Sequence, residues 1–228
     1  MVLAVADRSA RSGTERAGRV VEIVGPPGAG KTTLLEALRR SRPDIHVPHR
    51  RRARYVAWFI ATGLVSTPIP LARPEACRLG WRERMIMVHL GALHHLVPRP
   101  TTRHSVTLFD QGPVFMLTRL HGCAIHELTS VRLQRWWAMH VGRWASTVDT
   151  IIRLDAPDTV LMERIRTRAK WHVTKGQPES DAREFLRTFR RASDVILSGL
   201  SGAGVRVATF DTSQLDVPAL AQRLREHV

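Results

Sequence analysis

Asparagine is absent from this chain of 228 residues, and lysine occurs at only three positions among 35 basic residues. GTP-binding switch proteins read guanine with an Asn/Thr-Lys-x-Asp motif. The pair Thr174–Lys175 is followed by Gly-Gln, so the aspartate of that motif is missing. The sequence therefore argues against a guanine-nucleotide switch.

Cysteines and long apolar segments are also scarce. The two cysteines, Cys77 and Cys123, are far apart and match no metal-binding spacing, so we expect buried thiols in a reducing cytoplasm. The apolar start of the chain is too short for a secretory signal. The longest uncharged run, 56–72, contains two prolines and is too short to span a bilayer comfortably. We expect a cytoplasmic protein without a membrane segment.

Negative charge is in short supply, because 20 acidic residues stand against 35 basic ones and the formal net charge is +15. This balance favours polyanionic ligands such as nucleotides, phosphorylated substrates or nucleic acid. A solvated arginine-rich surface would give the same composition. No helix-turn-helix, zinc or aromatic-platform signature supports nucleic-acid binding. We therefore expect a small-molecule partner rather than nucleic acid.

Predicted strands alternate with predicted helices along the chain. Buried strands are predicted at 19–25, 105–110, 148–157 and 204–213, with a short one at 44–48. Helices are predicted at 31–41, 81–97, 126–146, 158–170, 179–200 and 217–228, within a helical but interrupted pattern over 50–97. The alternation favours one α/β domain over 19–228, with a parallel sheet covered by helices on both faces. Residues 1–18 are polar and are predicted to form a mobile tail.

The segment GPPGAGKT at 25–32 fits the pattern G-x-x-x-x-G-K-[ST] and stands between a predicted strand and a predicted helix, as the motif requires. Its glycines let backbone amides turn inward around a β-phosphate, and the helix N-terminus adds partial positive charge. Lys31 is expected to reach the β- and γ-phosphates, Thr32 to bind Mg²⁺ and Thr33 to reach the α-phosphate. The expected nucleotide-binding residues of the loop are Gly25, Gly28, Ala29, Gly30, Lys31, Thr32 and Thr33.

Asp110 ends the apolar run VTLFD. Ligands of open α/β sheets bind just beyond the carboxyl ends of the strands. An acid there can hold Mg²⁺ through water, or accept a proton from an attacking hydroxyl. Alternatively, Asp110 caps the helix that starts near Pro113, and the two roles can coexist.

Three arginines follow on the helix predicted at 158–170. Arg164 and Arg168 are four residues apart and are expected to share one helix face. Arginines that face a γ-phosphate neutralise the charge that develops during its transfer. Arg166 lies on a different face, where we expect it to be solvated.

Four features in this order resemble the thymidylate kinase and deoxynucleoside kinase group of P-loop kinases: GPPGAGKTT, an acid-ended third strand, LDAPDTVLMERIRTR, and FDTSQ before a final helix. The resemblance implies the three-layer P-loop fold, with a five-stranded parallel sheet in the order 2-3-1-4-5 and a helical lid at about 164–182. It implies that Arg164 lies near the adenine or the phosphates and that Arg168 belongs to the lid. The loop of Asp211, Thr212 and Ser213 is then expected by the adenine. ATP and Mg²⁺ are the implied cofactors, and a homodimer is one assembly that the resemblance allows.

The sequence also departs from that group. The third strand ends in Asp-Gln instead of an acid followed by arginine, and the segment VPHRRRARY after the second strand has no acid to serve as general base. The resemblance therefore leaves Asp110 as the base by elimination, with Glu75 and Glu83 as weaker alternatives. A plain nucleoside or thymidylate is not the expected acceptor.

In the resembling group the region of about 46–97 binds the acceptor. Its aromatic and guanidinium groups suit a planar or anionic molecule. The candidate contacts are Arg50, Arg54, Trp58, Trp81 and Arg84. Alternatively, the two tryptophans pack in the core or under the lid, and the arginine run is a solvated turn.

Two further patterns are interpreted without a binding function. Trp137, His140, Val141 and Trp144 recur at helical spacing, which predicts a stripe that faces the core. The histidines at 89, 94 and 95 have no carboxylate or cysteine at ligand spacing, so a metal site is not predicted there.

The sequence thus favours a small-molecule kinase, whose acceptor is nucleotide-like or a hydroxylated secondary metabolite or antibiotic. Lys31, Asp110, Arg164 and Arg168 are the residues expected to act in the transfer. The alternative is a P-loop ATPase that acts as a switch or regulatory ATP-binding protein without a small acceptor. A motor ATPase usually ends a strand in Asp-Glu, and here Gln111 takes the place of the glutamate.

Overall fold

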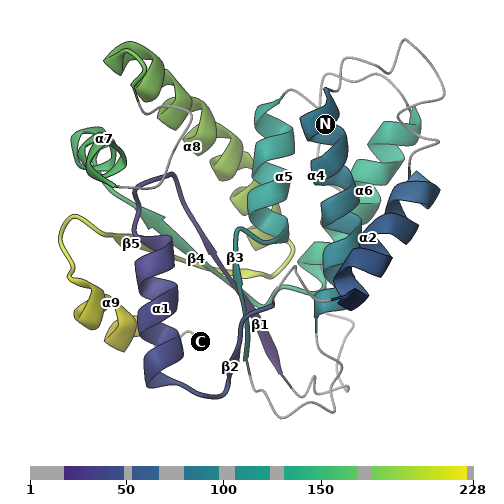
Figure 1. The fold of residues 1–228 in the computed structure, drawn as a ribbon, viewed down its shortest axis with the longest axis horizontal. Coiled ribbons are helices and arrows are strands. Elements are labelled where there is room, and N and C mark those ends of the chain that lie inside the picture. Colours follow the sequence, from purple (N-terminus) through teal and green to yellow (C-terminus); the bar gives the residue numbers. More distant parts are fainter. Residues whose placement is uncertain are drawn as a thin grey trace.

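The structure is a computed structural model, and it describes residues 18–48, 53–66, 80–97, 106–123, 131–168 and 176–224. Its centre is a five-stranded sheet in the order β2-β3-β1-β4-β5, with every neighbouring pair parallel. The strands are β1 (Arg19–Val24), β2 (Ile45–His46), β3 (Val106–Asp110), β4 (Thr150–Asp155) and β5 (Arg206–Asp211). The predicted α/β class and strand order are confirmed (Figure 1).

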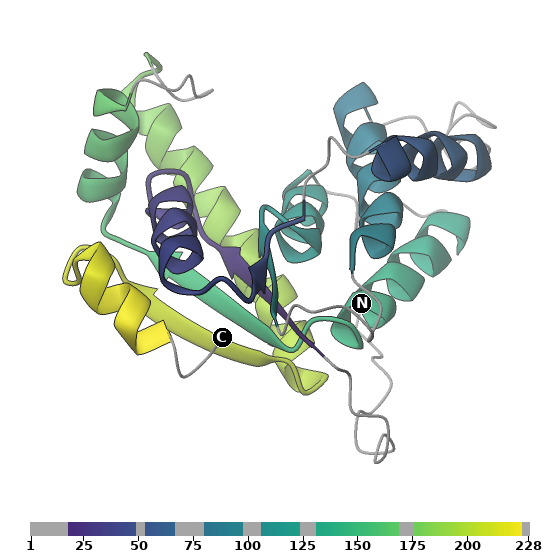
Figure 2. The same ribbon diagram turned by 60° about the horizontal axis from the view of Figure 1, so that its bottom comes forward.

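Helices cover both faces of this sheet (Figures 1 and 2). They are α1 (Lys31–Ser41), α2 (Ala53–Ser66), α4 (Trp81–Ala92), the 3-10 helix η3 (Leu93–Leu96), α5 (Pro113–Gly122), α6 (Val131–Ala145), α7 (Asp158–Thr167), α8 (Glu179–Gly202) and α9 (Val217–Leu224). α1 contacts α9 on one side, α5 contacts α8 on the other, and α2 packs on α4 beside α5. The continuous helix predicted at 81–97 is divided into α4 and η3.

The central strand β1 shows why the sheet has two covered faces. Val21 and Ile23 are buried against α1 and α9, whereas Val20 and Val24 are buried in the cluster that includes α5, α6 and α8. Side chains alternate between the faces of a strand, so a parallel strand between two helical layers is apolar on both sides. Glu22 is the exception in this strand, and it is completely buried.

Several expectations about individual side chains can be compared with the structure. Trp137, His140, Val141 and Trp144 are all buried along α6, which confirms the predicted core stripe. Cys123 is exposed, so the expectation of a buried thiol is wrong for this residue, which follows the last turn of α5.

Other predictions lie outside the described ranges. Cys77 is in this group, as is the predicted N-terminal tail apart from Gly18. Within the described part of the chain, no helix is long and apolar enough to cross a membrane.

Candidate active site

The phosphate loop joins β1 to α1, and its shape depends on glycine. Gly28 has a φ of 84°, and a Cβ there would lie 2.7 Å from the carbonyl oxygen of Leu161 in α7. Gly30 has a φ of 81° and is the N-cap of α1, which begins at Lys31 as the motif predicts. The absence of a Cβ thus lets the loop lie directly against α7, with the N-terminus of α1 at its end.

Lys31 is folded into the loop. Its Nζ donates hydrogen bonds of 2.8 Å to the carbonyl oxygens of Gly25 and Pro26. Burial lowers the pKa of Lys31 to about 8; the negative charge of Asp110 opposes this shift and the positive charge of Arg168 adds to it. Asp110 and Arg168 are therefore close enough to Lys31 to act on its charge.

The hydroxyl of Thr32 and the carboxylate of Asp110 are oxygen ligands of the kind that Mg²⁺ binds. Thr32 is exposed on the first turn of α1, and Asp110 is half-buried at the end of β3. Mg²⁺ keeps several waters and takes only one or two protein oxygens beside those of phosphates, so a hydroxyl and one carboxylate suffice. Among the described residues, no group of three or more His, Cys, Asp or Glu is placed to hold another kind of metal ion. Thr33 is exposed beside Thr32, and Ala29 is buried inside the loop.

A tight turn follows Asp110, which lies beside Ile23 of β1 in the parallel register. Gln111 has a φ of 55°, the only positive φ among the described non-glycine residues. Left-handed backbone of this kind costs free energy and recurs at functional sites. α5 then begins at Pro113 with Gly112 as N-cap, and the amides of Val114 and Phe115 in its first turn bond to Glu22 and not to Asp110.

Glu22 accepts hydrogen bonds from two backbone amides in the first turn of α5. Its Oε2 accepts a hydrogen bond of 2.8 Å from the N–H of Val114, and its Oε1 accepts one of 2.9 Å from the N–H of Phe115. Burial raises the pKa of Glu22 to about 8, while these amides and that of Gly112 act in the opposite direction. Sequence reasoning missed this residue, although one acid inside the apolar strand RVVEIV was a signal.

Arg164 connects the phosphate loop to the loop after β5. Its guanidinium donates to the carbonyl oxygen of Gly28 at 3.3 Å, and to Oγ1 and the carbonyl oxygen of Thr212 at 3.0 and 2.9 Å. Asp211 accepts hydrogen bonds from the amide and hydroxyl of Ser213, and these lower the pKa of Asp211. The structure thus brings together the predicted donor-side residues Arg164, Asp211, Thr212 and Ser213.

Arg168 does not continue the helix face of Arg164. α7 ends at Thr167, and Arg168 is its C-cap with extended backbone (φ −69°, ψ 146°), so the prediction of one shared helix face is wrong. Its charge still acts on Lys31, which places it toward the phosphate loop. Arg166 is exposed and pairs with Glu163, as expected for a solvated position.

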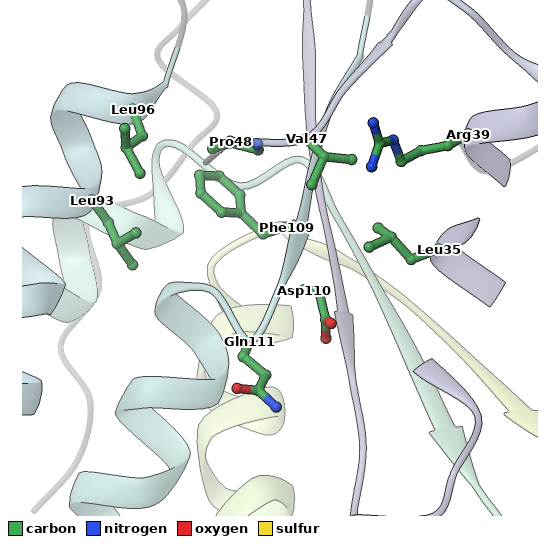
Figure 3. Close-up of a pocket in the computed structure, with 9 residues that line it drawn as sticks. All are labelled: Leu35, Arg39, Val47, Pro48, Leu93, Leu96, Phe109, Asp110 and Gln111. Atoms are coloured by element: carbon green, nitrogen blue, oxygen red, sulfur yellow. The ribbon is translucent and has the colours of Figure 1, made fainter. Parts of the chain in front are cut away.

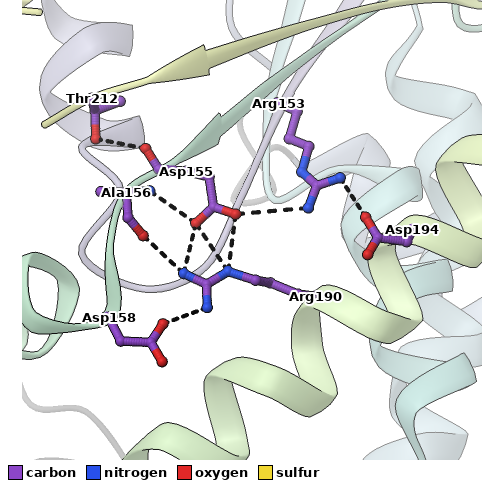
Figure 4. Close-up of polar contacts among 7 residues, drawn as sticks. All are labelled: Arg153, Asp155, Ala156, Asp158, Arg190, Asp194 and Thr212. Atoms are coloured by element: carbon purple, nitrogen blue, oxygen red, sulfur yellow. Dashed lines mark hydrogen bonds and ion pairs between the residues drawn. The ribbon is translucent and has the colours of Figure 1, made fainter. Parts of the chain in front are cut away.

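A network of charges fixes the base of α7 (Figure 4). Arg190 of α8 donates to both carboxylate oxygens of Asp155 and also pairs with Asp158 in the first turn of α7. Arg153 pairs with Asp155 and with Asp194. The hydrogen bond with Asp155 is the largest cause that raises the pKa of Arg190. The network holds α7 to α8, and the sequence did not reveal it because its residues come from separate segments.

A cavity of about 320 Å³ opens beside Asp110 (Figure 3). Six of the residues that line it are apolar and three are polar. The lining residues are Leu35, Arg39, Val47, Pro48, Leu93, Leu96, Phe109, Asp110 and Gln111. Asp110 therefore belongs both to the surroundings of Lys31 and to this cavity.

Three of the acceptor residues that the sequence suggested, Trp58, Trp81 and Arg84, have described side chains, and none of these three is among the nine residues that line the cavity. Trp58 is 42% exposed on α2 and stacks on His95, with ring centroids 3.6 Å apart. Trp81 is 72% exposed, so the alternative that the two tryptophans belong to the core is wrong. Arg84 is half-buried on α4.

Two of the other candidates lie on helices, and two lie outside the described residues. Arg54 belongs to α2, and Glu83 lies in the first turn of α4, where it interacts with Cys123. Arg50 and Glu75 fall outside the described ranges.

Comparison with known proteins shows which class of protein has this fold. The chain is similar to a solved structure of deoxyadenosine kinase from M. mycoides with bound dATP, at 12% identity and a TM-score of 0.52, over 92% of this chain and 98% of that one. It is also similar to the same kinase with the products dCMP and dCDP, at 12% identity and a TM-score of 0.51, over 91% of this chain and 97% of that one. No protein-family model and no curated protein sequence matches the chain. The chain has the fold of P-loop deoxynucleoside kinases, which confirms the predicted likeness at the level of the fold.

Proposed function

We propose that this chain is an ATP-dependent phosphotransferase that moves the γ-phosphate of ATP·Mg²⁺ to a small molecule. The observation that carries the proposal is the position of Asp110, which acts on the charge of Lys31 and also lines a cavity of about 320 Å³. A kinase needs its acceptor and its phosphate site to meet at one point, and a nucleotide switch does not. The likeness to deoxyadenosine kinases supports the same class of reaction.

In this proposal the phosphate loop binds the triphosphate through its backbone amides and Lys31. Thr32 and Asp110 would hold Mg²⁺, which neutralises charge on the phosphates when it is bound. Arg164 ties the loop to Thr212 and so keeps the adenine side in place. Arg168 supplies a second positive charge near Lys31. Asp110 would accept the proton of an acceptor hydroxyl, or orient that hydroxyl beside the metal.

The walls of the cavity describe the acceptor. Phe109, Leu93 and Leu96 offer an apolar surface, while Gln111 and Arg39 offer hydrogen bonds at the edge. This chemistry suits a hydroxyl compound with an apolar or planar body. A nucleoside-like acceptor is supported by the similar kinases. A hydroxylated secondary metabolite or antibiotic is the second candidate, because Val47 and Pro48 line the cavity after β2 where the resembling group has an acid.

The test measures ADP release from ATP·Mg²⁺ with deoxynucleosides, deoxynucleotides and hydroxylated antibiotics as acceptors. Turnover that rises with one class of acceptor supports the kinase and names that class. Equal turnover with and without every acceptor would contradict it and would support an ATPase switch or regulatory protein. Lys31→Ala is the matched control: it should abolish turnover while the circular dichroism spectrum stays unchanged.

We place this activity in the cytoplasm, where ATP·Mg²⁺ is supplied. The predicted homodimer and the lid at about 164–182 stay predictions. Sedimentation at several protein concentrations would test the first of them.

A further inference from the structure

A single buried carboxylate links the strand of the phosphate loop to the helix behind Asp110. Glu22 lies in the middle of β1, three residues before the loop, and has no exposed surface. Its two oxygens accept the amides of Val114 and Phe115. The side chain therefore crosses from β1 to the first turn of α5.

The segment between Asp110 and α5 is held tightly on that path. Gly112 is so closely packed that a Cβ on it would lie 2.6 Å from Cβ of Phe109 and 3.0 Å from Cδ of Glu22. Gln111, between Asp110 and Gly112, has left-handed backbone. A non-glycine residue keeps this conformation only where its surroundings impose it. Here Phe109 and Glu22 enclose the turn.

Packing alone does not explain why a glutamate stands at position 22 in the buried strand β1. A buried carboxyl group loses its hydration, and an apolar side chain of similar volume fills such a place at lower cost. What an apolar side chain cannot do is accept the two amides at the start of α5. The geometry of those two bonds fixes α5 relative to β1, and with it the short turn that follows Asp110 at the end of β3.

We propose that Glu22 is a positioning residue for the phosphoryl transfer described above: by holding the amides of Val114 and Phe115, it fixes the turn of Gln111 and Gly112 and so directs the Asp110 carboxylate at the Mg²⁺ and γ-phosphate site. The inference rests on the proposed function. Glu22 itself touches neither nucleotide nor acceptor. It acts on Asp110 through the backbone turn of Gln111 and Gly112.

The test uses ATP as the probe and compares its affinity with and without Mg²⁺, measured by calorimetry on the full chain. Asp110→Asn is the reference and should reduce the Mg²⁺-dependent gain in affinity by about ten-fold, the size of one lost charge-assisted contact. Glu22→Ala should reduce the gain to the same extent, with Mg²⁺-free affinity for ATP unchanged. Glu22→Gln keeps the shape and part of the acceptor capacity, so it should restore part of the gain.

Two further variants separate positioning from stability. Leu117→Ala removes a fully buried side chain from α5 without touching its first turn, and it should keep the full Mg²⁺-dependent gain. Gly112→Ala keeps the Glu22 carboxyl group but crowds it and Phe109, so the turn should be displaced and the gain should be lost as in Glu22→Ala. Should Glu22→Ala fail to fold, Glu22→Gln and Gly112→Ala still decide the question.

The outcomes are distinguishable from a failure of the proposed function. If Asp110→Asn loses the gain but the Glu22 and Gly112 variants keep it, Glu22 is a structural cap only and the inference is overturned. If Leu117→Ala loses the gain as well, the effect follows stability and the inference is likewise overturned. If Asp110→Asn keeps the gain, both the metal role of Asp110 and the inference fall.

Discussion

Arg164 of α7 donates hydrogen bonds to both the hydroxyl and the carbonyl oxygen of Thr212, and the same guanidinium reaches the carbonyl oxygen of Gly28. One side chain therefore joins the phosphate loop to the loop after β5. These two loops come from opposite ends of the chain, one before α1 and the other after β5. Their separation sets the width of the proposed ATP site.

We predict that Arg164→Ala weakens ATP binding by about ten-fold or more, because it removes charged hydrogen bonds that hold both loops. Arg164→Lys should rescue little, since an ammonium cannot reproduce the forked geometry. Arg166→Ala is the control, because Arg166 is exposed and pairs with the exposed Glu163 on the same helix. Calorimetric titration with ATP compares the three. An Arg164→Ala variant that binds ATP as tightly as the Arg166→Ala variant would contradict the role.

The pH dependence of stability should report Glu22. Its pKa is raised to about 8 from an ordinary value of 4.5, so between these values the native state holds a proton that the unfolded state has lost. The free energy of unfolding contributed by Glu22 therefore falls as pH rises from about 4.5 to about 8. The expected fall is about 2–4 kcal/mol.

Glu22→Gln cannot ionise, and its urea-unfolding free energy should lack this fall between pH 5 and pH 8. The comparison uses the slope against pH, so a constant loss of stability in the variant does not affect it. Glu36→Gln, on the exposed side of α1, is the control and should keep the wild-type slope. Parallel slopes in wild type and Glu22→Gln would show that Glu22 does not titrate in this range.

Arg190→Ala should destabilise the fold by about 2–4 kcal/mol, since it leaves the half-buried carboxylates of Asp155 and Asp158 without their main partner. Added salt should reduce this loss of stability only weakly, because these groups are partly shielded from solvent. Arg187→Ala on the same helix is the matched control: its ion pair with Glu184 is exposed and should contribute less than about 1 kcal/mol. Chemical denaturation gives both values. Equal losses for the two arginines would contradict the role of the network.

The site shows which parts of a protein the sequence predicts well. The phosphate loop and its strand–helix context depend on residues adjacent in sequence, so the loop was predicted down to the helix start at Lys31. Asp110 followed from the rule that parallel strands end at the ligand edge. Glu22 did not follow, because the amides that it binds lie 92 and 93 residues further along the chain.

The residues around the acceptor cavity were harder to predict, because they too come together from distant parts of the sequence. Leu93 and Leu96 are ordinary apolar residues, and they line a cavity only because η3 turns them toward the end of β3. Trp58 and Trp81 were more conspicuous in the sequence, yet both are exposed. Residue type alone does not show which apolar side chains border a cavity, since this depends on how the helices pack.

The cavity itself yields the last prediction. Leu96→Trp places a larger side chain at a half-buried wall of the cavity, away from the phosphate loop. It should raise KM for the acceptor by about ten-fold or more, while the affinity for ATP changes by less than about two-fold, because only the acceptor would compete for the filled volume. Leu133→Met, in the buried part of α6 and not among the residues that line the cavity, is the control for a changed apolar side chain. If Leu96→Trp leaves KM for every active acceptor unchanged, the acceptor binds elsewhere, and the exposed surface around Trp58 and Trp81 becomes the next region to test.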